Sequence, residues 1–399
     1  MKSLRELDIK GKRVLMRVDF NVPIKEGKVT DDTRIQASLP SIKYVIDNGG
    51  KLILMSHLGR PKGKKNETFS LKPVAECLAK ILERQVKFFP CCIDKEKQSQ
   101  ATYLMREGDI ILLENTRFHP EEEKNDLEYA KNLAKLGDVY VNDAFGSAHR
   151  AHSSVAAITF YFREKAMGLL MEKEVKYLSL LLEAPKHPFI TVLGGAKVAD
   201  KIEVIQNLLP RIDKLLLGGG MVFTFFKAKG YEIGNSLLET DKLDLVKKLL
   251  DTGGNKISLP KDIVIGDKFD KDAQKKEVLA NKIEKGWMGL DIGKQTIIEY
   301  QQILNTAKTI FWNGPMGVFE LDRFADGTRA IANKIAAREV TTVIGGGDTI
   351  AAIHKFGYSD WSESEIPLLQ GKVTHISTGG GASLEFLAGL TLPGIEALM

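Results

Sequence analysis

Short apolar runs recur along the chain, and each is followed by a turn and then by apolar residues at helical spacing. The runs occupy residues 13–20, 51–58, 109–116, 138–145, 188–195, 213–220, 308–315, 340–347 and 372–380. They are rich in Val, Ile and Leu and hardly alternate with polar residues, which is typical of strands buried on both faces. Strands that alternate with helices predict an α/β fold with parallel sheets covered by helices.

A break near the middle of the chain predicts two domains. The pattern is helical from residue 167 to about residue 183 and then stops at Pro185 and Pro188, because proline lacks a backbone donor and disfavours helix in the residue before it. The alternative is a single doubly wound sheet, but nine strands lie above the common range. We therefore expect an N-terminal domain over residues 1–168, a connecting helix over 169–185 and a second domain over 186–376.

Composition narrows the class of protein. Lys and Arg number 57 against 52 Asp and Glu, a formal net charge of +5, and no run of five or six like charges is present. This mild excess suits small anionic ligands and does not predict nucleic-acid binding. The first residues carry no apolar signal segment, and no stretch approaches the ~18 apolar residues that span a membrane, so we expect a cytoplasmic enzyme without a membrane partner.

The three cysteines indicate no disulfide framework. None forms a CxxC pair, which argues against zinc and thioredoxin-like sites. Cys91 and Cys92 are adjacent, and a redox role for them stays open beside a structural one.

Polar and mostly basic side chains follow four strands of the first half. The set comprises Asp19, Asn21, Arg34, His57, Arg60, Arg117, His119, His149, Arg150 and His152. Ligands of open α/β sheets bind beyond the carboxyl ends of the strands, and arginine pairs bidentately with phosphate or carboxylate. These residues therefore predict a site for a multiply charged anion. His149 and His152 could instead form a metal pair, but no third ligand lies at a suitable spacing.

The second half places glycines at the corresponding points. They lie at 194–195, 218–220, 345–347 and 379–381, each time between a predicted strand and a predicted helix. Glycine permits close approach of a ligand, and free N–H groups at the start of a helix attract phosphate. Neither GxxxxGK[ST] nor GxGxxG occurs at these turns, which argues against a Walker-type NTPase and a standard dinucleotide fold.

Charged residues beside the glycines suggest how a phosphate would be held. Lys197 and Lys201 are four residues apart and are expected on one helix face, where both could reach phosphate. Asp348 follows the third glycine turn and could hold Mg²⁺ or simply cap a helix. Glu320 and the segment 285–293 could form a nucleoside pocket.

Together these segments closely resemble the phosphoglycerate kinase family. The motifs are RVDFNVP (17–23), SHLGRP (56–61), ENTRFHPEE (114–122), NDAFGSAHRAHSS (142–154), GGAKVADKI (194–202), GGGMVFTF (218–225), GWMGLDIG (286–293), WNGPMGVFE (312–320), GGGDT (345–349) and STGGGASLEFL (377–387). They occur in the family's order and cover the chain from about residue 3 to its end. One departure is Lys294, where the family usually has proline, and it lies in the loop expected at the nucleotide rim.

The resemblance implies two Rossmann-like domains that face each other across a hinged cleft. The first would bind 3-phosphoglycerate or 1,3-bisphosphoglycerate through Asp19, Asn21, Arg34, His57, Arg60, Arg117 and Arg150. The second would bind MgADP or MgATP through Lys197, Lys201, Gly289, Glu320, Gly346, Gly347, Asp348 and Thr349. Residues 377–399 would form a hinge and return to the first domain. We expect a monomer.

The implied reaction is reversible phosphoryl transfer between 1,3-bisphosphoglycerate and ADP, a step of glycolysis that gives 3-phosphoglycerate and ATP. Its acceptor oxygens are largely deprotonated at pH 7, so no general base is needed, and catalysis rests on positioning and charge neutralisation. We expect Arg34 and Lys197 to reach the transferred group, with backbone N–H groups at Gly345 and Gly379, while Asp348 holds the metal. Domain closure would bring donor and acceptor together and exclude water.

Two other classes remain open on these residues. A phosphate-binding module would close on its ligand without turnover, and it would need neither Lys197 nor Asp348. A sugar kinase would need a carboxylate base near the substrate hydroxyl, for which Asp19 is the candidate.

Overall fold

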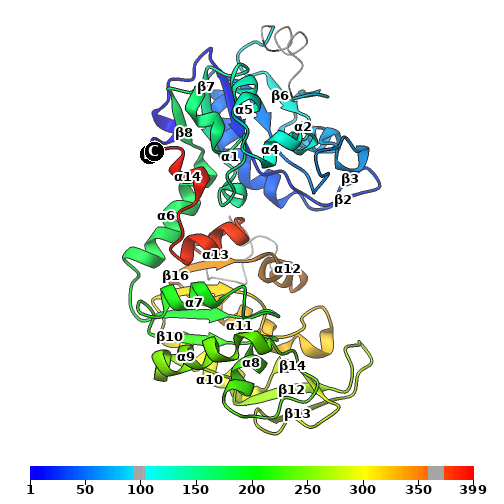
Figure 1. Ribbon diagram of the computed structural model, residues 1–399, viewed down its shortest axis with the longest axis vertical. Coiled ribbons are helices and arrows are strands. Elements are labelled where there is room, and N and C mark those ends of the chain that lie inside the picture. The colour runs from blue at the N-terminus through cyan, green and yellow to red at the C-terminus, as the bar shows by residue number, and fades with distance from the viewer. Residues whose placement is uncertain (93–101, 103, 358–372) are drawn as a thin grey trace. The chain divides into compact units, whose positions relative to one another are not determined.

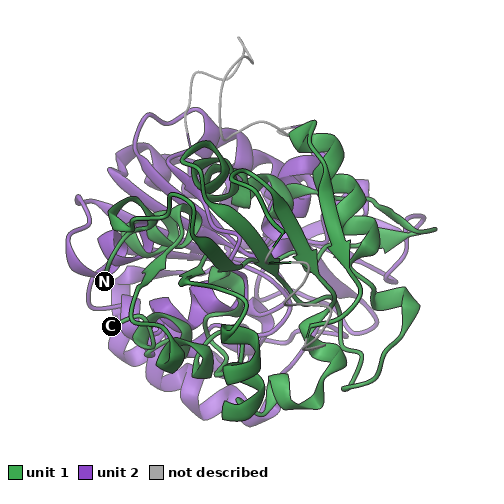
Figure 2. Cartoon of the chain, turned by 90° about the horizontal axis from the view of Figure 1, so that it is seen from above, with its two compact units in different colours: residues 1–176, 391–399 green, residues 177–390 purple. Residues whose placement is uncertain are grey.

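The computed structural model describes residues 1–92, 102, 104–357 and 373–399. The chain forms two compact units (Figure 2): unit 1 comprises residues 1–176 and 391–399, and unit 2 comprises residues 177–390. The division falls inside helix α6, Leu169–Glu183. Of the predicted returning segment, residues 377–390 belong to unit 2, where Asn207 Nδ2 donates to the backbone oxygen of Leu387 at 2.7 Å.

Unit 1 is built on a six-stranded parallel sheet with the order β5-β6-β4-β1-β7-β8 (Figure 1). Its strands are β1 Arg13–Arg17, β4 Lys51–Met55, β5 Val86–Phe89, β6 Ile110–Leu113, β7 Val139–Asn142 and β8 Lys165–Met167. Its helices are α1 Thr33–Asp47, α2 Lys72–Leu82, α4 Pro120–Glu123, α5 Leu127–Ala134 and α14 Pro393–Glu396, and a small hairpin joins β2 Ile24–Lys25 to β3 Lys28–Val29. Buried residues of β1 and β4 such as Met16 and Leu54 pack with Ile42 of α1 in one apolar core.

Unit 2 repeats this plan with the strand order β11-β10-β9-β15-β16-β17, and all pairs are parallel. Its strands are β9 Phe189–Leu193, β10 Lys214–Leu217, β11 Ile257–Ser258, β15 Thr309–Asn313, β16 Thr341–Gly345 and β17 His375–Ile376. Its helices are α7 Ile202–Leu208, α8 Val222–Ala228, α9 Leu243–Gly253, α10 Lys294–Thr306, α11 Asp326–Ala336, α12 Gly347–Lys355 and α13 Gly381–Leu387. The predicted α/β fold with helix-covered parallel sheets is therefore confirmed.

A further antiparallel sheet in unit 2 was not predicted. Its order is β13-β12-β14, with β12 Asp262–Gly266, β13 Lys275–Leu279 and β14 Met288–Ile292. Residues of β13 alternate between exposed and half-buried, so this strand has one solvated face and lacks the continuous apolar run that marks the central strands. Its strand β14 carries Gly289, one of the residues predicted to bind nucleotide.

The parallel arrangement places all strand ends of one unit at the same edge of its sheet. In unit 1, Leu15 of β1 lies beside Ile53 of β4 and Tyr140 of β7, so the loops after these strands begin at the same level. Polar residues that are distant in sequence are thereby brought together. Among the helices described, none has the length and apolar character needed to cross a membrane.

Candidate functional site

The loops after β1 and β4 form the first part of a charged site in unit 1. Asp19 Oδ2 accepts a hydrogen bond from Arg34 Nη1 at 2.8 Å, and Asn21 Oδ1 accepts one from the backbone N–H of Gly59 at 2.9 Å. Burial raises the pKa of Asp19, but the positive charges of Arg34 and Arg17 outweigh it and lower that pKa to about 2. Asp19 is therefore ionised, and its carboxylate is paired with Arg34.

Arg17 is a member of this site that the sequence reasoning missed. Its side chain is fully buried, Nε donates to Ser154 Oγ at 2.9 Å, and Nη2 lies 3.1 Å from His57 Nδ1. A third bond joins Nη1 to the backbone oxygen of Val18. The signal available in the sequence was an arginine directly after the apolar residues 14–16 of the strand, because a buried charge is retained only where partners satisfy it.

Arg117 and Arg150 bring more positive charge to the same edge. Arg117 Nη1 donates to the backbone oxygen of Gly59 at 2.9 Å, and Arg150 Nε donates to His149 Nε2 at 3.0 Å. Burial, together with the neighbouring positive charges, lowers the pKa of Arg117 to about 10 and that of His152 to about 3. Positive side chains that lower one another's pKa in this way would be stabilised by a bound anion.

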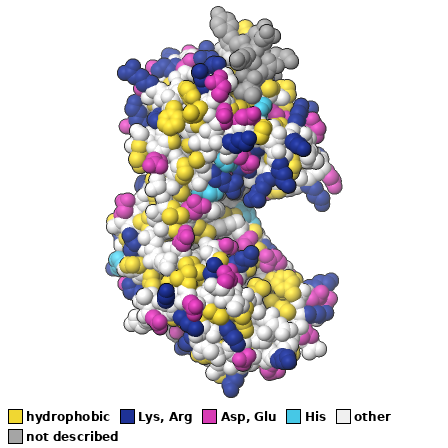
Figure 3. All heavy atoms as spheres, in the orientation of Figure 1, with side chains coloured by type: hydrophobic (Ala, Val, Ile, Leu, Met, Phe, Trp, Pro, Cys, Tyr) yellow, Lys and Arg dark blue, Asp and Glu magenta, His cyan; other side chains and the backbone are white. Residues whose placement is uncertain are grey.

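The predicted anion-binding residues thus lie on neighbouring loops of one unit. Arg60 follows Gly59 and is exposed. In Figure 3, Lys, Arg and His side chains gather on one part of the unit 1 surface.

The glycine turns of unit 2 allow three loops to approach closely. A Cβ at Gly194 would lie 2.0 Å from the backbone oxygen of Pro315. Gly219 has a positive φ of 68°, and a Cβ there would lie 2.5 Å from the backbone nitrogen of Gly195. These glycines are therefore required by packing between loops. Gly347 differs, because a Cβ there would meet nothing within 4 Å at the start of α12, where a ligand could approach.

The prediction that Lys197 and Lys201 share a helix face is wrong. Helix α7 begins at Ile202, and the glutamate carboxylate of Glu239 accepts the N–H groups of Val198 and Ala199, which holds residues 197–201 in a turn. Lys197 is exposed in that turn.

Lys201 is largely buried and lies beside the end of β15. Its Nζ donates to Asn313 Oδ1. Burial lowers the pKa of Lys201 to about 8, against the opposing charges of Asp200 and Asp348. This lysine can therefore still offer positive charge at pH 7.

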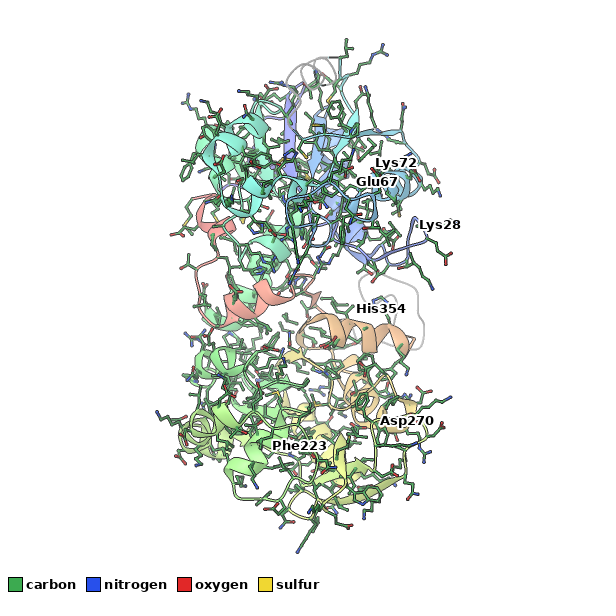
Figure 4. All side chains as sticks on the ribbon, turned by 45° about the vertical axis from the view of Figure 1, so that its right-hand side comes forward. Lys28, Glu67, Lys72, Phe223, Asp270 and His354 are labelled. Atoms are coloured by element: carbon green, nitrogen blue, oxygen red, sulfur yellow. The ribbon has the colours of Figure 1, made fainter. Side chains whose placement is uncertain are left out.

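A pocket of about 460 Å³ opens beside these loops, and most of its lining is apolar. Its lining includes Gly289, Glu320 and Asp348 of the predicted nucleotide site, together with Phe223 and Phe269, which the sequence reasoning did not select. A pocket with apolar walls and a few polar groups at its edge is typical of small-molecule sites. Phe223 lies within unit 2 (Figure 4).

Gly289 is required by the pocket wall. Its N–H donates to Ser236 Oγ at 2.9 Å, and a Cβ there would lie 2.0 Å from Cζ of Phe223. No side chain fits without moving that ring. Glu320 and Asp348 are exposed at the pocket edge.

Three other predicted residues have roles within the protein. Thr349 is buried, and its Oγ1 accepts a hydrogen bond from the N–H of Gly314 at 2.6 Å. The N–H of Gly379 donates to Ser377 Oγ at 3.3 Å, and Gly345 is the buried last residue of β16.

Few side chains among the described residues could serve as metal ligands. Within the described ranges, no group of three or more His, Cys, Asp or Glu residues could hold a metal ion by itself. The predicted pair of His149 and His152 therefore has no third ligand of these types there. Mg²⁺ usually takes one or two carboxylates and completes its shell with water and substrate phosphates. The exposed carboxylate of Asp348, beside the pocket and the start of α12, fits such a partly protein-bound ion.

Comparison with known proteins gives the family. A family model described as Phosphoglycerate kinase matches residues 4–390. Phosphoglycerate kinases of Deinococcus radiodurans and Chloroherpeton thalassium are each 53% identical to the chain, cover all of it, and are covered to 94% and 98% of their own lengths. The solved structure of phosphoglycerate kinase from Coxiella burnetii is 39% identical, with a TM-score of 0.87 over 100% of this chain and 98% of that one. The chain therefore belongs to the phosphoglycerate kinase family and is a phosphotransferase.

Proposed function

We propose that the chain catalyses reversible, Mg²⁺-dependent phosphoryl transfer between 1,3-bisphosphoglycerate and ADP, giving 3-phosphoglycerate and ATP in cytoplasmic glycolysis. The observation that carries the proposal is the cluster of arginines and histidines at the strand ends of unit 1. Burial and neighbouring positive charge lower the pKa of Arg117, His152 and His57, so a bound anion would stabilise this cluster. We also propose that the protein acts as a monomer.

In this proposal the two ligands bind to different domains. Residues 1–168 bind the glycerate substrate, with Asp19, Asn21, Arg34, His57, Arg60, Arg117 and Arg150 as its contacts. Residues 186–376 bind nucleotide, with the base in the pocket beside Gly289 and the phosphates at Lys197, Lys201 and residues 346–349. Residues 169–185, which include α6, and residues 377–399 connect the domains and act as the hinge.

The chemistry needs no general base. In the direction of ATP synthesis, an oxygen of the ADP β-phosphate attacks the acyl phosphorus, the bond to the acyl oxygen breaks, and a carboxylate leaves. Arg34 and Lys197 neutralise charge on the transferred group, assisted by the N–H groups of Gly345 and Gly379. Asp348 would hold Mg²⁺, and the bound ion would supply further charge neutralisation.

The sugar-kinase alternative depends on Asp19 as a base. A general base works best with a pKa near the working pH. The pKa of Asp19 is about 2, and its carboxylate is engaged by Arg34, so this residue suits a positioning role.

The test measures ADP release from MgATP with 3-phosphoglycerate, with hydroxylamine to trap the acyl phosphate. Turnover should require both substrates and fall by orders of magnitude in Arg34→Ala and Lys197→Ala, because each removes charge neutralisation. Lys248→Ala, an exposed lysine of α9, is the matched control and should leave turnover unchanged. Binding of both ligands without turnover would instead identify a binding module.

Domain closure has its own test. Small-angle scattering should show a smaller radius of gyration when both ligands are bound than with either alone. An unchanged radius would contradict closure and leave the chemistry untouched.

A further inference from the structure

His57 lies at one end of a buried hydrogen-bond chain that neither its motif nor the family assignment explains. The chain runs from Glu122 through Ser154 and Arg17 to the imidazole. Three of these residues are fully buried, and His57 is only 5% exposed. Buried polar networks of this kind fix geometry when every member is satisfied.

The direction of each hydrogen bond follows from the groups involved. Ser154 Oγ donates to Glu122 Oε1 at 2.5 Å, so it has only lone pairs left for Arg17 Nε, which donates to it at 2.9 Å. A guanidinium has donors and no acceptor. Arg17 Nη2 must therefore donate to His57 Nδ1 across the 3.1 Å that separate them.

An imidazole nitrogen that accepts a hydrogen bond carries no proton. Nδ1 of His57 is then the acceptor, and the single ring proton lies on Nε2. Imidazolium is excluded, because both of its nitrogens are donors.

We infer that Arg17, oriented by Ser154 and Glu122, is a positioning residue that keeps His57 as the neutral Nε2–H tautomer, so that His57 offers its anionic substrate a hydrogen bond and not a charge. The substrate role of His57 rests on the proposed function; the tautomer does not. Neutrality has a clear use, since the arginines already supply the charge that an anion needs.

The charged surroundings of His57 agree with this geometry. Burial lowers the pKa of His57 well below its ordinary value, and Arg17, Arg117 and Arg34 lower it further. Asp19 opposes them, with Oδ1 4.0 Å from Nδ1, but Arg34 already neutralises that carboxylate at 2.8 Å.

The test is nitrogen-15 NMR of the histidine rings in the full-length protein, with His57 assigned by the loss of its signals in His57→Gln. The expected spectrum shows an unprotonated Nδ1 and a protonated Nε2, unchanged between pH 5.5 and 8. A positively charged ring near pH 6, or a proton on Nδ1, would overturn the inference even if the enzyme is fully active. Absence of phosphoryl transfer would instead overturn the proposed function and leave the tautomer result standing.

Variants separate positioning from packing. Arg17→Met combined with Glu122→Gln removes both buried charges together, and Ser154→Ala keeps both charges but breaks the link between them. Each should give mixed tautomers of His57 and raise the KM for 3-phosphoglycerate, by roughly 10- to 100-fold in the double variant, with kcat unchanged, because a hydrogen bond to a charged ligand is lost equally from ground and transition states.

Ser153→Ala is the matched control. Ser153 is the buried neighbour of Ser154, and its Oγ donates to the backbone oxygens of Glu121 and Asp126 and not to the network. It should leave the His57 spectrum and KM unchanged. If the double variant does not fold, Ser154→Ala decides, and a wild-type spectrum in Ser154→Ala together with a wild-type KM would refute the role of the chain.

Discussion

Replacing Asp143 by asparagine should stabilise the protein relative to the wild type, by an amount that grows between pH 4 and pH 7. Asp143 is fully buried after β7, and its Oδ1 accepts the N–H groups of Leu170 at 2.9 Å and Met171 at 3.2 Å at the start of α6. Its Oδ2 is buried as well, and a Cβ at Gly168 would lie 2.1 Å from Oδ1. The carboxyl is therefore tightly enclosed and poorly solvated.

The magnitude follows from linkage between protonation and folding. Burial raises the pKa of Asp143 from 3.8 to about 7, although hydrogen bonds from Ser41, Met171 and Leu170 oppose it. Because the folded state holds this proton more tightly, stability is highest below pH 3.8 and falls as the pH rises towards 7. Each pH unit between the two values corresponds to about 1.4 kcal/mol, so the whole interval amounts to roughly 4 kcal/mol. Asparagine keeps the Oδ1 acceptor and has no charge to bury.

The assay is urea unfolding of Asp143→Asn and wild type at several pH values from 4 to 8. The difference in free energy of unfolding cancels all other titrating groups and should rise with pH and then level off above pH 7. Asp138→Asn is a control of opposite sign: Arg13, 2.6 Å away, lowers the pKa of Asp138, so its loss should destabilise the protein by a nearly constant amount above pH 5. A difference for Asp143→Asn that is independent of pH would refute the reasoning.

Three further predictions concern the nucleotide side. Gly289→Ala should raise the KM for nucleotide in steady-state assays and cost about 1–3 kcal/mol of stability by overpacking against Phe223, whereas an unchanged KM would remove the strand from the site. The wild type should lose nucleotide affinity in calorimetry above pH 8, where Lys201 becomes neutral, and Lys201→Gln should show no such loss; a wild-type affinity that stays constant to pH 10 would contradict this. Asp348→Asn should shift the Mg²⁺ concentration for half-maximal turnover upwards, while an unchanged Mg²⁺ dependence would exclude Asp348 as a ligand.

Local pattern was sufficient for much of the fold. The nine apolar runs all contain a strand of the two parallel sheets, because a strand buried on both faces must be apolar at consecutive positions. Strands without such runs were missed: β13 alternates and is charged on its exposed face, and β11 has only two residues. A strand of two residues is detected only where a longer apolar run surrounds it, as it does around β17 and not around β11.

Local sequence pattern predicted only part of the candidate sites. The sequence was sufficient to predict that Asp19, His57 and Arg117 lie in one site, because the loops after parallel strands share one edge of the sheet. The turn at Lys197 could not be predicted, because a tertiary contact fixes it: Glu239, 41 residues from Val198, accepts the N–H group of Val198.

The sequence by itself determined the fold class and the family. It also showed that arginines follow the strands of the first half and glycines those of the second half. These features depend only on the order of residue types along the chain. Only the tertiary structure decided which polar groups meet: Arg17 with His57, 40 positions apart, and Asp143 with the start of α6, 27 positions apart. Burial and hydrogen-bond direction depend on neighbours from distant segments, and these neighbours set the pKa and the tautomer of a side chain.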